Sequence, residues 1–195
     1  MTAAAGRPPG PADSGDVGGP GAGAWPAGRG DSGDEADPGV ASRIIGLLTS
    51  RELTVATAES LTGGLVCAAL TDVPGASAVL RGGVVAYATE LKAALLGVPT
   101  TLLAERGAVD PDVAAAMADG VRERLNAAVG VATTGVAGPD SSEGKPPGTV
   151  HVAVSSKTGR ITRTLALAGD RQQIRQDTVR RCLSLLWAVL AEEDG

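Results

Sequence analysis

The sequence has few of the side chains that most metal and redox sites require, with one histidine and two cysteines in 195 residues. With His151 alone, an HExxH motif or any other site with two histidines cannot form. Cys67 and Cys182 are too few for a disulfide framework, and neither belongs to a C-x-x-C pair that would suit zinc or redox chemistry. We therefore expect two reduced, buried thiols and no metal site.

The chain also lacks a long apolar run and a surplus of positive charge. No stretch approaches the ~18 apolar residues that a membrane span needs, and Met1–Gly10 contains no apolar signal segment. The 17 Lys and Arg residues stand against 22 Asp and Glu, a net charge of −5, whereas coating a nucleic acid requires a basic surplus. We therefore predict a cytoplasmic protein with no membrane partner and no direct nucleic-acid partner.

Glycine and proline are concentrated at the N-terminus. Residues 1–39 hold 11 of the 28 glycines and 6 of the 12 prolines, together with six acids and two bases. Their large apolar side chains are too few to offset the entropy of ordering this backbone. We predict a disordered acidic tail at 1–39 and one folded domain at 40–195.

From Val40 onward, apolar residues recur with the periods of helices and strands. Predicted helices cover 40–51, a run after Gly64 that ends at Leu70, 89–96, a segment that begins at Asp110-Pro111, and a last segment from about Gly169. Predicted strands cover 53–58, 81–88, 129–134, 150–155 and 161–168, the last two joined by a hairpin turn at 156–159. This alternation predicts an α/β fold with a mixed sheet covered by helices on both faces.

Small, polar, glycine-bearing loops follow three of the predicted strands, at 59–64, 134–138 and 168–171. Ligands in open α/β sheets bind beyond the carboxyl ends of the strands, so these loops would form one pocket. Gly63 and Gly64 would let backbone N–H groups approach an oxyanion or a phosphate. Tight helix–strand packing is the other interpretation of the two glycines, but the nearby hydroxyls of Ser60 and Thr62 favour a functional loop.

Two familiar motifs are absent. The segment 138–145 resembles a P-loop, but five residues separate its glycines instead of four, and Pro146 stands where Ser or Thr would bind magnesium. Ser60 lacks the G-x-S-x-G context of a nucleophile elbow. His151 lies on the opposite face of its strand from the neighbouring valines, which favours a solvated or packing histidine over a catalytic one.

A serine nucleophile can use a lysine as its base when burial lowers the pKa of the lysine. Of the three lysines, Lys145 lies in a proline-rich loop and Lys157 in the hairpin turn, so we expect both to be exposed. Lys92 lies early in the helix that follows the second strand, close to Tyr87, the only tyrosine. The sequence leaves open whether Lys92 is a base in the pocket or a solvent-facing helix residue.

Arg171 and Arg175 lie four residues apart at the start of the last predicted helix and share a face. The planar fork of arginine suits a phosphate. We expect Arg171 to be the first contact of a phosphate-bearing ligand and Arg175 the second. Ion pairs with Asp170, Asp177 or another acid are the alternative for both.

Seven segments of the chain stand in an order that resembles a known family. They are AESLTGG at 58–64, GVVAY at 83–87, Lys92 with GV at 97–98, GAV at 107–109, TGVAGP at 134–139, Lys145-Pro146 with GTV at 148–150, and GDR at 169–171. Over residues 40–190 the chain resembles the C-terminal domain of the competence/damage-inducible protein CinA. Stand-alone members of this family are nicotinamide-nucleotide amidases.

The resemblance implies a three-layer α/β/α sandwich that hydrolyses nicotinamide mononucleotide to nicotinate mononucleotide and ammonia, in pyridine nucleotide salvage. Ser60 would be the nucleophile, Lys92 its base, and Tyr87 a support for the pair or for the substrate. The substrate-binding residues would be Thr62, Gly63, Gly64, Thr134 and Gly135 as donors to the amide oxyanion or the phosphate, and Arg171 with Arg175 for the phosphate. The resemblance implies no metal or organic cofactor, and it implies that the protein forms a homo-oligomer.

The chain departs from the family pattern in the loop 140–147, where Asp140, Ser141 and Ser142 replace a glycine-rich turn and Pro147 replaces an aliphatic residue. Leu61 stands where many members have cysteine. Two other hypotheses therefore stay open. One is a nucleotide-binding or partner-binding module without turnover, linked to competence or DNA damage, and the other is an amidase for a different pyridine nucleotide or small amide.

Overall fold

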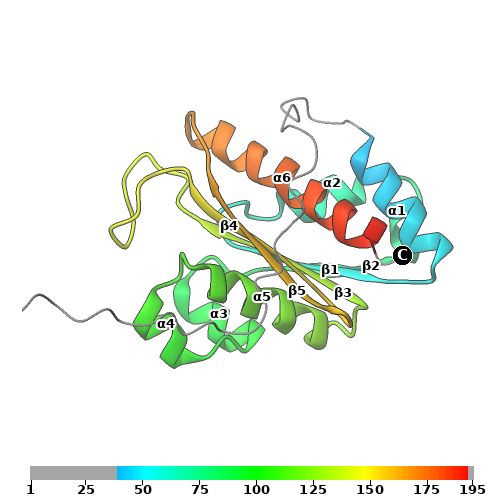
Figure 1. Ribbon diagram of the computed structural model, residues 1–195, viewed down its shortest axis with the longest axis horizontal. Helices are drawn as coiled ribbons and strands as arrows, with labels where there is room; N and C mark the ends of the chain where they lie inside the picture. The colour runs from blue at the N-terminus through cyan, green and yellow to red at the C-terminus, as the bar shows by residue number, and fades with distance from the viewer. Residues whose placement is uncertain (1–38, 193–195) are drawn as a thin grey trace, which may run out of the picture.

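The computed structural model describes residues 39–192, so the predicted tail lies outside the described residues except for Gly39 (Figure 1). The strands are β1 Val55–Glu59, β2 Leu80–Val85, β3 Val129–Gly135, β4 Thr149–Ser156 and β5 Gly159–Ala166. The helices are α1 Val40–Ser50, α2 Leu65–Thr71, α3 Thr89–Leu96, α4 Thr100–Arg106, α5 Pro111–Arg124 and α6 Arg171–Glu192, with a short 3₁₀ turn η1 at Ala76–Ala78.

The five strands form one mixed sheet in the order β2-β1-β3-β4-β5. Strand β1 is central to its parallel part, because Ala58 pairs with Val84 of β2 on one side and with Ala132 of β3 on the other. Strands β3, β4 and β5 pair antiparallel, and Thr134 lies opposite His151. The predicted mixed sheet and the β4–β5 hairpin are confirmed. The carboxyl ends of β1, β2, β3 and β5 lie at the same edge.

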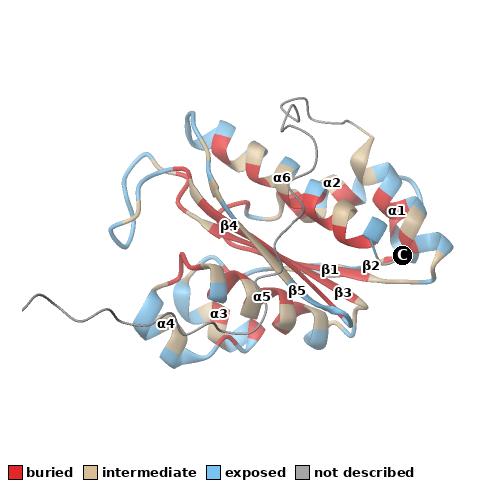
Figure 2. Ribbon diagram, viewed as in Figure 1, coloured by how far each residue is buried: buried red, intermediate tan, exposed pale blue. Residues whose placement is uncertain are grey.

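Helices cover both faces of the sheet, as predicted (Figure 1). Helices α1, α2 and α6 lie on one face, and α3, α4 and α5 on the other. Figure 2 shows that the buried side of each layer faces the sheet. Strand residues alternate between the two faces, so valines such as Val55, Val131 and Val152 pack under α1, α2 and α6. The predicted three-layer α/β/α sandwich is therefore confirmed.

Small residues line the other face of the sheet, where α5 packs. Ala58, Ala132 and Ala153 are fully buried there against the apolar stripe of α5 formed by Val113, Met117 and Val121. A Cβ at Gly130 of β3 would overlap the carbonyl oxygen of Ala118 in α5. Because the sheet presents so little bulk, α5 lies close to it.

The contact between α5 and α3 depends on a second glycine. A Cβ at Gly120 would overlap the carbonyl oxygen of Leu96, so we expect Gly120→Ala to lower the free energy of unfolding by about 1–3 kcal/mol, the usual cost of overpacking. The matched control is Gly46→Ala in α1, which has nothing within 4 Å and should stabilise by about 0.5–1 kcal/mol. Urea denaturation measures both. Equal effects of the two changes would contradict this account of α5.

The structure differs from the sequence prediction in several places. Strand β2 ends at Val85 instead of at residue 88, because the chain then turns so that the next two carbonyl groups face Lys92. Helix α4 was not predicted, and it has no buried residue that would give a periodic signal. Cys182 is buried as predicted, but Cys67 is only half-buried. Within residues 39–192, no helix has both the length and the apolar character of a membrane span.

Candidate active site

A pocket of about 240 Å³ lies at the carboxyl edge of the sheet. Its wall is formed by the turn after β1, the segment that leads into α3, the segment before α5, the end of β3 with the loop that follows it, and the first residue of α6. Among the residues named from the sequence, it includes Ser60, Tyr87, Lys92, Thr134, Gly135 and Arg171. The three loops predicted to form one pocket, at 59–64, 134–138 and 168–171, all contribute to it, together with the segment that follows β2.

Ser60 and Lys92 meet in this pocket. The distance from Lys92 Nζ to Ser60 Oγ is 3.2 Å. Alternation along β1 explains the direction of Ser60: the preceding Glu59 points to the α2 face, where it accepts hydrogen bonds from the start of α2, so Ser60 points to the α3 face. The two groups are 32 residues apart in sequence, and two neighbouring strand ends bring them together.

Lys92 is buried, with 1% of its surface exposed. Its Nζ donates to the carbonyl oxygens of Ala86 at 2.9 Å and Tyr87 at 3.4 Å, besides its contact with Ser60. Burial lowers the pKa of Lys92 from its ordinary value of 10.5, while the carboxylates of Glu143 and Glu90 act in the opposite direction. The open question about Lys92 is thus answered in favour of the pocket, because this lysine does not face solvent.

Gly63 and Gly64 have hydrogen bonds that keep their N–H groups inside their own turn. The Gly63 N–H donates to the Ser60 carbonyl oxygen at 3.1 Å. The Gly64 N–H donates to Glu59 Oε2 at 2.9 Å, and the same carboxylate accepts from Val66 and Cys67. The Glu59 carboxylate therefore satisfies N–H groups at the start of α2, whose N-cap residue Gly64 has no side chain to do so. Neither glycine lines the pocket.

Thr62 and Arg175 lie behind the pocket wall instead of in it. The Thr62 hydroxyl is within 2.7 Å of the Thr133 hydroxyl, and both residues are fully buried. Arg175 donates to the carbonyl oxygens of Leu61 and Thr62, both at 2.9 Å. These bonds hold the turn that carries Ser60, so we leave Thr62, Gly63, Gly64 and Arg175 out of the substrate contacts proposed below.

Arg171 and Tyr87 lie at the mouth of the pocket, and both are exposed. Arg171 donates to the carbonyl oxygen of Gly138 at 2.8 Å and to the Tyr87 hydroxyl at 2.9 Å. These contacts replace the ion pairs that were the sequence alternative for Arg171. Thr134 also lines the pocket, but its hydroxyl donates to the Ala108 carbonyl oxygen at 2.7 Å. Its proton is therefore not available to an oxyanion.

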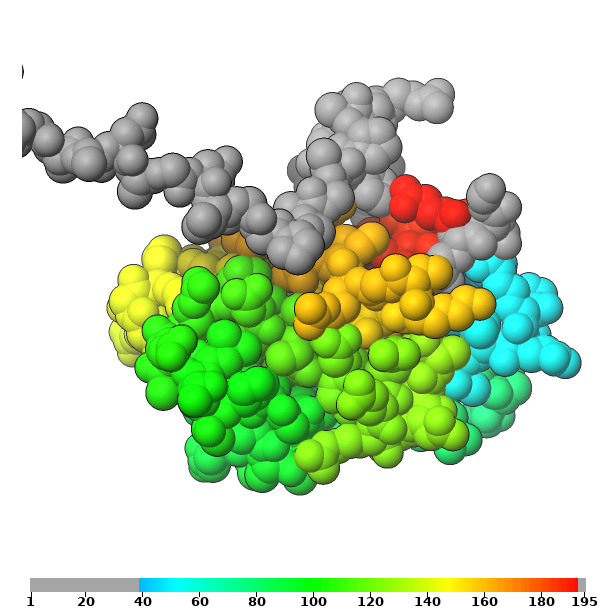
Figure 3. All heavy atoms as spheres, turned by 60° about the horizontal axis from the view of Figure 1, so that its bottom comes forward, coloured from blue at the N-terminus to red at the C-terminus, as the bar shows by residue number. Residues whose placement is uncertain are grey.

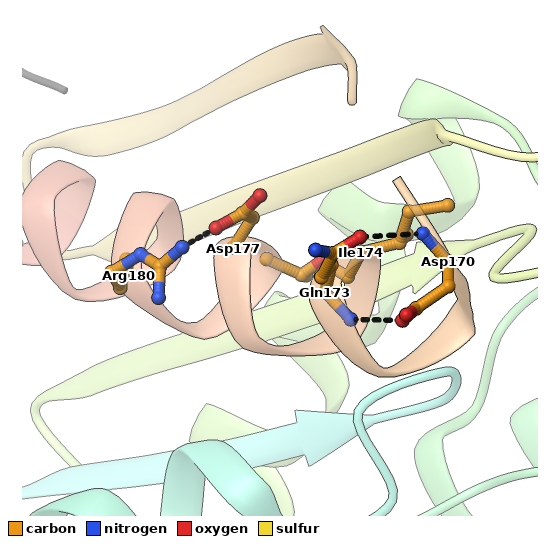
Figure 4. A network of polar contacts seen from close by, with 6 residues as sticks. Asp170, Gln173, Ile174, Asp177 and Arg180 are labelled. Atoms are coloured by element: carbon orange, nitrogen blue, oxygen red, sulfur yellow. Dashed lines mark hydrogen bonds and ion pairs between the residues drawn. The ribbon is translucent and has the colours of Figure 1, made fainter. Parts of the chain in front are cut away.

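The start of α6, where Arg171 is the first residue, is capped by two side chains (Figure 4). Asp170 Oδ1 accepts from the Gln173 N–H at 2.9 Å, and Gln173 Oε1 accepts from the Asp170 N–H at 2.8 Å. This reciprocal pair is a capping box, and it fixes Arg171 as the first helical residue. Asp177 pairs with Arg180 one turn further on.

Sequence reasoning missed the part played by the loop between β3 and β4. Glu143 of this loop lines the pocket, and its carboxylate accepts from the Ala108 N–H at 2.9 Å and the Val109 N–H at 3.1 Å. Figure 3 shows the loop, in yellow, against the green layer of α3 to α5. Nothing in the local pattern around Glu143 signals a contact with residues so far away in sequence.

The remaining candidate groups have structural contacts. His151 is buried, with its Nδ1 2.9 Å from the Thr164 hydroxyl, and burial lowers its pKa. It is the packing histidine that its strand position favoured. Lys145 was expected to be exposed, but it is half-buried and its Nζ donates to the Arg106 carbonyl oxygen at 3.3 Å. Within residues 39–192, no three His, Cys, Asp or Glu side chains form a group that could hold a metal ion.

Comparison with known proteins places this chain in a family. The model described as the CinA C-terminal domain matches residues 38–190. A CinA-like protein of Frankia casuarinae is 55% identical over 148 residues, and one of Geobacter sulfurreducens is 46% identical over 149. Each alignment covers 76% of this chain but 34% and 36% of the two relatives, so the chain spans about a third of their length.

Solved structures agree in fold. The competence/damage inducible protein CihA from Agrobacterium tumefaciens is 42% identical, with a TM-score of 0.75 and coverage of 77% of this chain and 93% of that one. A competence-damaged protein (CinA) superfamily protein from Escherichia coli is 33% identical, with a TM-score of 0.76 and coverage of 82% and 94%. The names of these relatives refer to competence and damage and state no reaction.

Proposed function

Because the chain belongs to the CinA C-terminal domain family, we propose that its pocket is the active site of an amidase that hydrolyses the carboxamide of nicotinamide mononucleotide. The products are nicotinate mononucleotide and ammonia, and the pathway is pyridine nucleotide salvage. The observation that carries the proposal is the buried Lys92 Nζ at 3.2 Å from Ser60 Oγ in the pocket wall. A serine hydroxyl beside a neutral amine is a nucleophile with its base.

The contacts of Lys92 support its role as a base. A neutral amine has two N–H groups and one lone pair, and the carbonyl oxygens of Ala86 and Tyr87 can accept both hydrogens. The lone pair then faces the Ser60 hydroxyl, which donates its hydrogen to it. In the first step Ser60 Oγ attacks the amide carbon while Lys92 takes the hydroxyl proton. Lys92 returns this proton to the leaving nitrogen, which departs as ammonia and leaves an ester on Ser60.

Water completes the reaction by the same route. Lys92 takes a proton from a water molecule, whose oxygen attacks the ester carbon, and then returns the proton to Ser60 Oγ as the acid is released. Each half-reaction passes through an oxyanion that needs a donor. Leu61 follows the nucleophile directly and lines the pocket, and its N–H has no hydrogen-bond partner within residues 39–192. We propose this N–H as one oxyanion donor.

Arg171 supports a substrate with a phosphate. Its guanidinium lies at the mouth of the same pocket that Ser60 lines. Its hydrogen bonds to the Gly138 carbonyl oxygen and the Tyr87 hydroxyl hold it there, and its other N–H groups are still able to donate. A nucleotide amide could therefore bind with its amide at Ser60 and its phosphate at Arg171. Tyr87 then orients Arg171 through its hydroxyl, while its backbone carbonyl orients Lys92.

The direct test is ammonia release by the purified full chain from a panel of amides. The panel contains nicotinamide mononucleotide, nicotinamide riboside, free nicotinamide and glutamine. We expect turnover of the mononucleotide, with a lower kcat/KM for the riboside because it lacks the phosphate. Binding of the mononucleotide without ammonia would instead favour the non-catalytic module, and turnover of another amide alone would overturn the proposed substrate.

A further inference from the structure

The pocket carries more negative charge than amide hydrolysis explains. Asp140 and Glu143 line it together with Arg171 and Lys92. Among the described residues, neither carboxylate forms an ion pair with Arg171, which donates to a carbonyl oxygen and a hydroxyl. When Lys92 is neutral, as the proposed mechanism requires, two carboxylates in this pocket face one guanidinium.

The Glu143 side chain is held in place by hydrogen bonds. Its two carboxylate oxygens accept from the N–H groups of Ala108 and Val109, both of which line the pocket. A Cβ at Gly107 would overlap this carboxylate, so the glycine makes the approach possible. On the other side, Ser142 and Lys145 exchange two backbone hydrogen bonds at 3.0 and 2.9 Å across the loop. The charge therefore has a fixed position in the wall.

This fixed charge opposes the proposed base. The Glu143 carboxylate raises the pKa of Lys92 against the larger effect of burial, and so favours the protonated form that cannot accept a proton. The other charged groups around Lys92 are Glu90 on its own helix and, in the pocket, Asp140 and Arg171. A positive charge on a bound substrate would offset the field of Glu143 and favour neutral Lys92 when the substrate is in place.

Building on the proposed amidase function, we propose that Glu143 is a specificity-determining residue that selects amides whose ring carries a positive charge. The substrate class is then a zwitterion with a cationic ring beside Glu143 and an anionic phosphate beside Arg171. Opposite charges at two parts of one pocket favour one orientation of such a molecule. A neutral-ring amide of the same shape would bring no positive charge to the Glu143 carboxylate.

The test compares two ring forms of one molecule. Nicotinamide mononucleotide has a pyridinium ring, and its 1,4-dihydro form has the same amide, ribose and phosphate on an uncharged ring. Dissociation constants are measured by calorimetry for the full chain with Ser60→Ala, which prevents turnover. We expect the pyridinium form to bind about two- to fivefold more tightly, as for one charge contact at Glu143, which is exposed. Adding Glu143→Gln should reduce this ratio to about one.

Glu90→Gln in the same background is the matched control, because Glu90 acts on Lys92 but does not line the pocket, and the ratio should persist. A structural role of Glu143 alone would weaken both ring forms equally and leave the ratio unchanged. Equal binding of the two forms by Ser60→Ala overturns the inference, whatever Glu143→Gln does. If the wild type releases ammonia but Ser60→Ala binds both ring forms equally, only the inference is overturned. If Ser60→Ala prefers the pyridinium form but the wild type releases no ammonia, only the proposed function is overturned. Failure of both forms to bind overturns both.

Discussion

The Ser60→Ala protein should release no measurable ammonia from nicotinamide mononucleotide, with a loss of roughly 10⁴-fold or more in kcat. The methyl group cannot form the ester, while Arg171 and the Leu61 N–H remain in place to bind substrate. Titration of the mononucleotide should therefore give a dissociation constant within a few-fold of the wild-type KM. Ammonia release and calorimetric titration on the same preparation measure the two quantities.

The matched control for this change is Ser184→Ala, which removes a hydroxyl from an exposed position of α6 and should leave ammonia release unchanged. Intact-mass spectrometry of the wild-type chain mixed with substrate adds a second measurement, because an ester on Ser60 increases the mass of the protein by the nicotinoyl nucleotide. A Ser60→Ala protein that retains activity would remove Ser60 from the mechanism.

Lys92→Met should lower kcat/KM by roughly 10³-fold or more, because methionine fills the space but cannot accept a proton. The wild-type rate should rise with pH, since only the neutral amine is a base, and level off above the lowered pKa of Lys92. Lys157→Met in the exposed hairpin turn is the control and should keep the full rate and its pH profile. A Lys92→Met protein with the wild-type pH profile would exclude this lysine as the base.

The same burial links stability to pH. The folded-state pKa of Lys92 is below its ordinary value of 10.5, so between these two values the unfolded chain binds more protons than the folded one. The wild type should therefore gain stability relative to Lys92→Met as pH rises through this interval, by up to about 1.4 kcal/mol per pH unit. Urea denaturation of both proteins across this pH range measures the difference.

Much of the fold could be predicted because its elements have periodic patterns. The valines of β4 and the Val113–Met117–Val121 stripe of α5 alternate or recur as their structures require. Helix α4 buries no residue, so it has no such pattern. The end of β2 depends on the two carbonyl oxygens that accept hydrogen bonds from Lys92, and that contact is tertiary. Local sequence propensity therefore does not predict where β2 ends.

The site could be predicted only in part for a related reason. The spacing from strand ends placed Ser60 and Lys92 at the same edge, and the structure brings them together. Hydroxyls and glycines at 60–64 suggest a loop that donates to a ligand, yet most of these donors are used within the turn and by Glu59. Which N–H and O–H donors remain available to a ligand depends on tertiary hydrogen bonds, and the residue types alone do not predict these. The same holds for Glu143, whose partners are 34 and 35 residues away.

The close contact at Gly120 has a consequence for the pocket as well as for packing. Its neighbour Leu96 lies one helical turn from Lys92 on α3, so a shift of α3 at this contact would also move Lys92 relative to Ser60. Bulk at this position would move α3 outward, and reactive groups tolerate misplacement poorly, since about 1 Å can cost 10²-fold in rate. We therefore expect Gly120→Ala to lower the rate of the proposed hydrolysis even where the protein still folds, although residue 120 does not line the pocket.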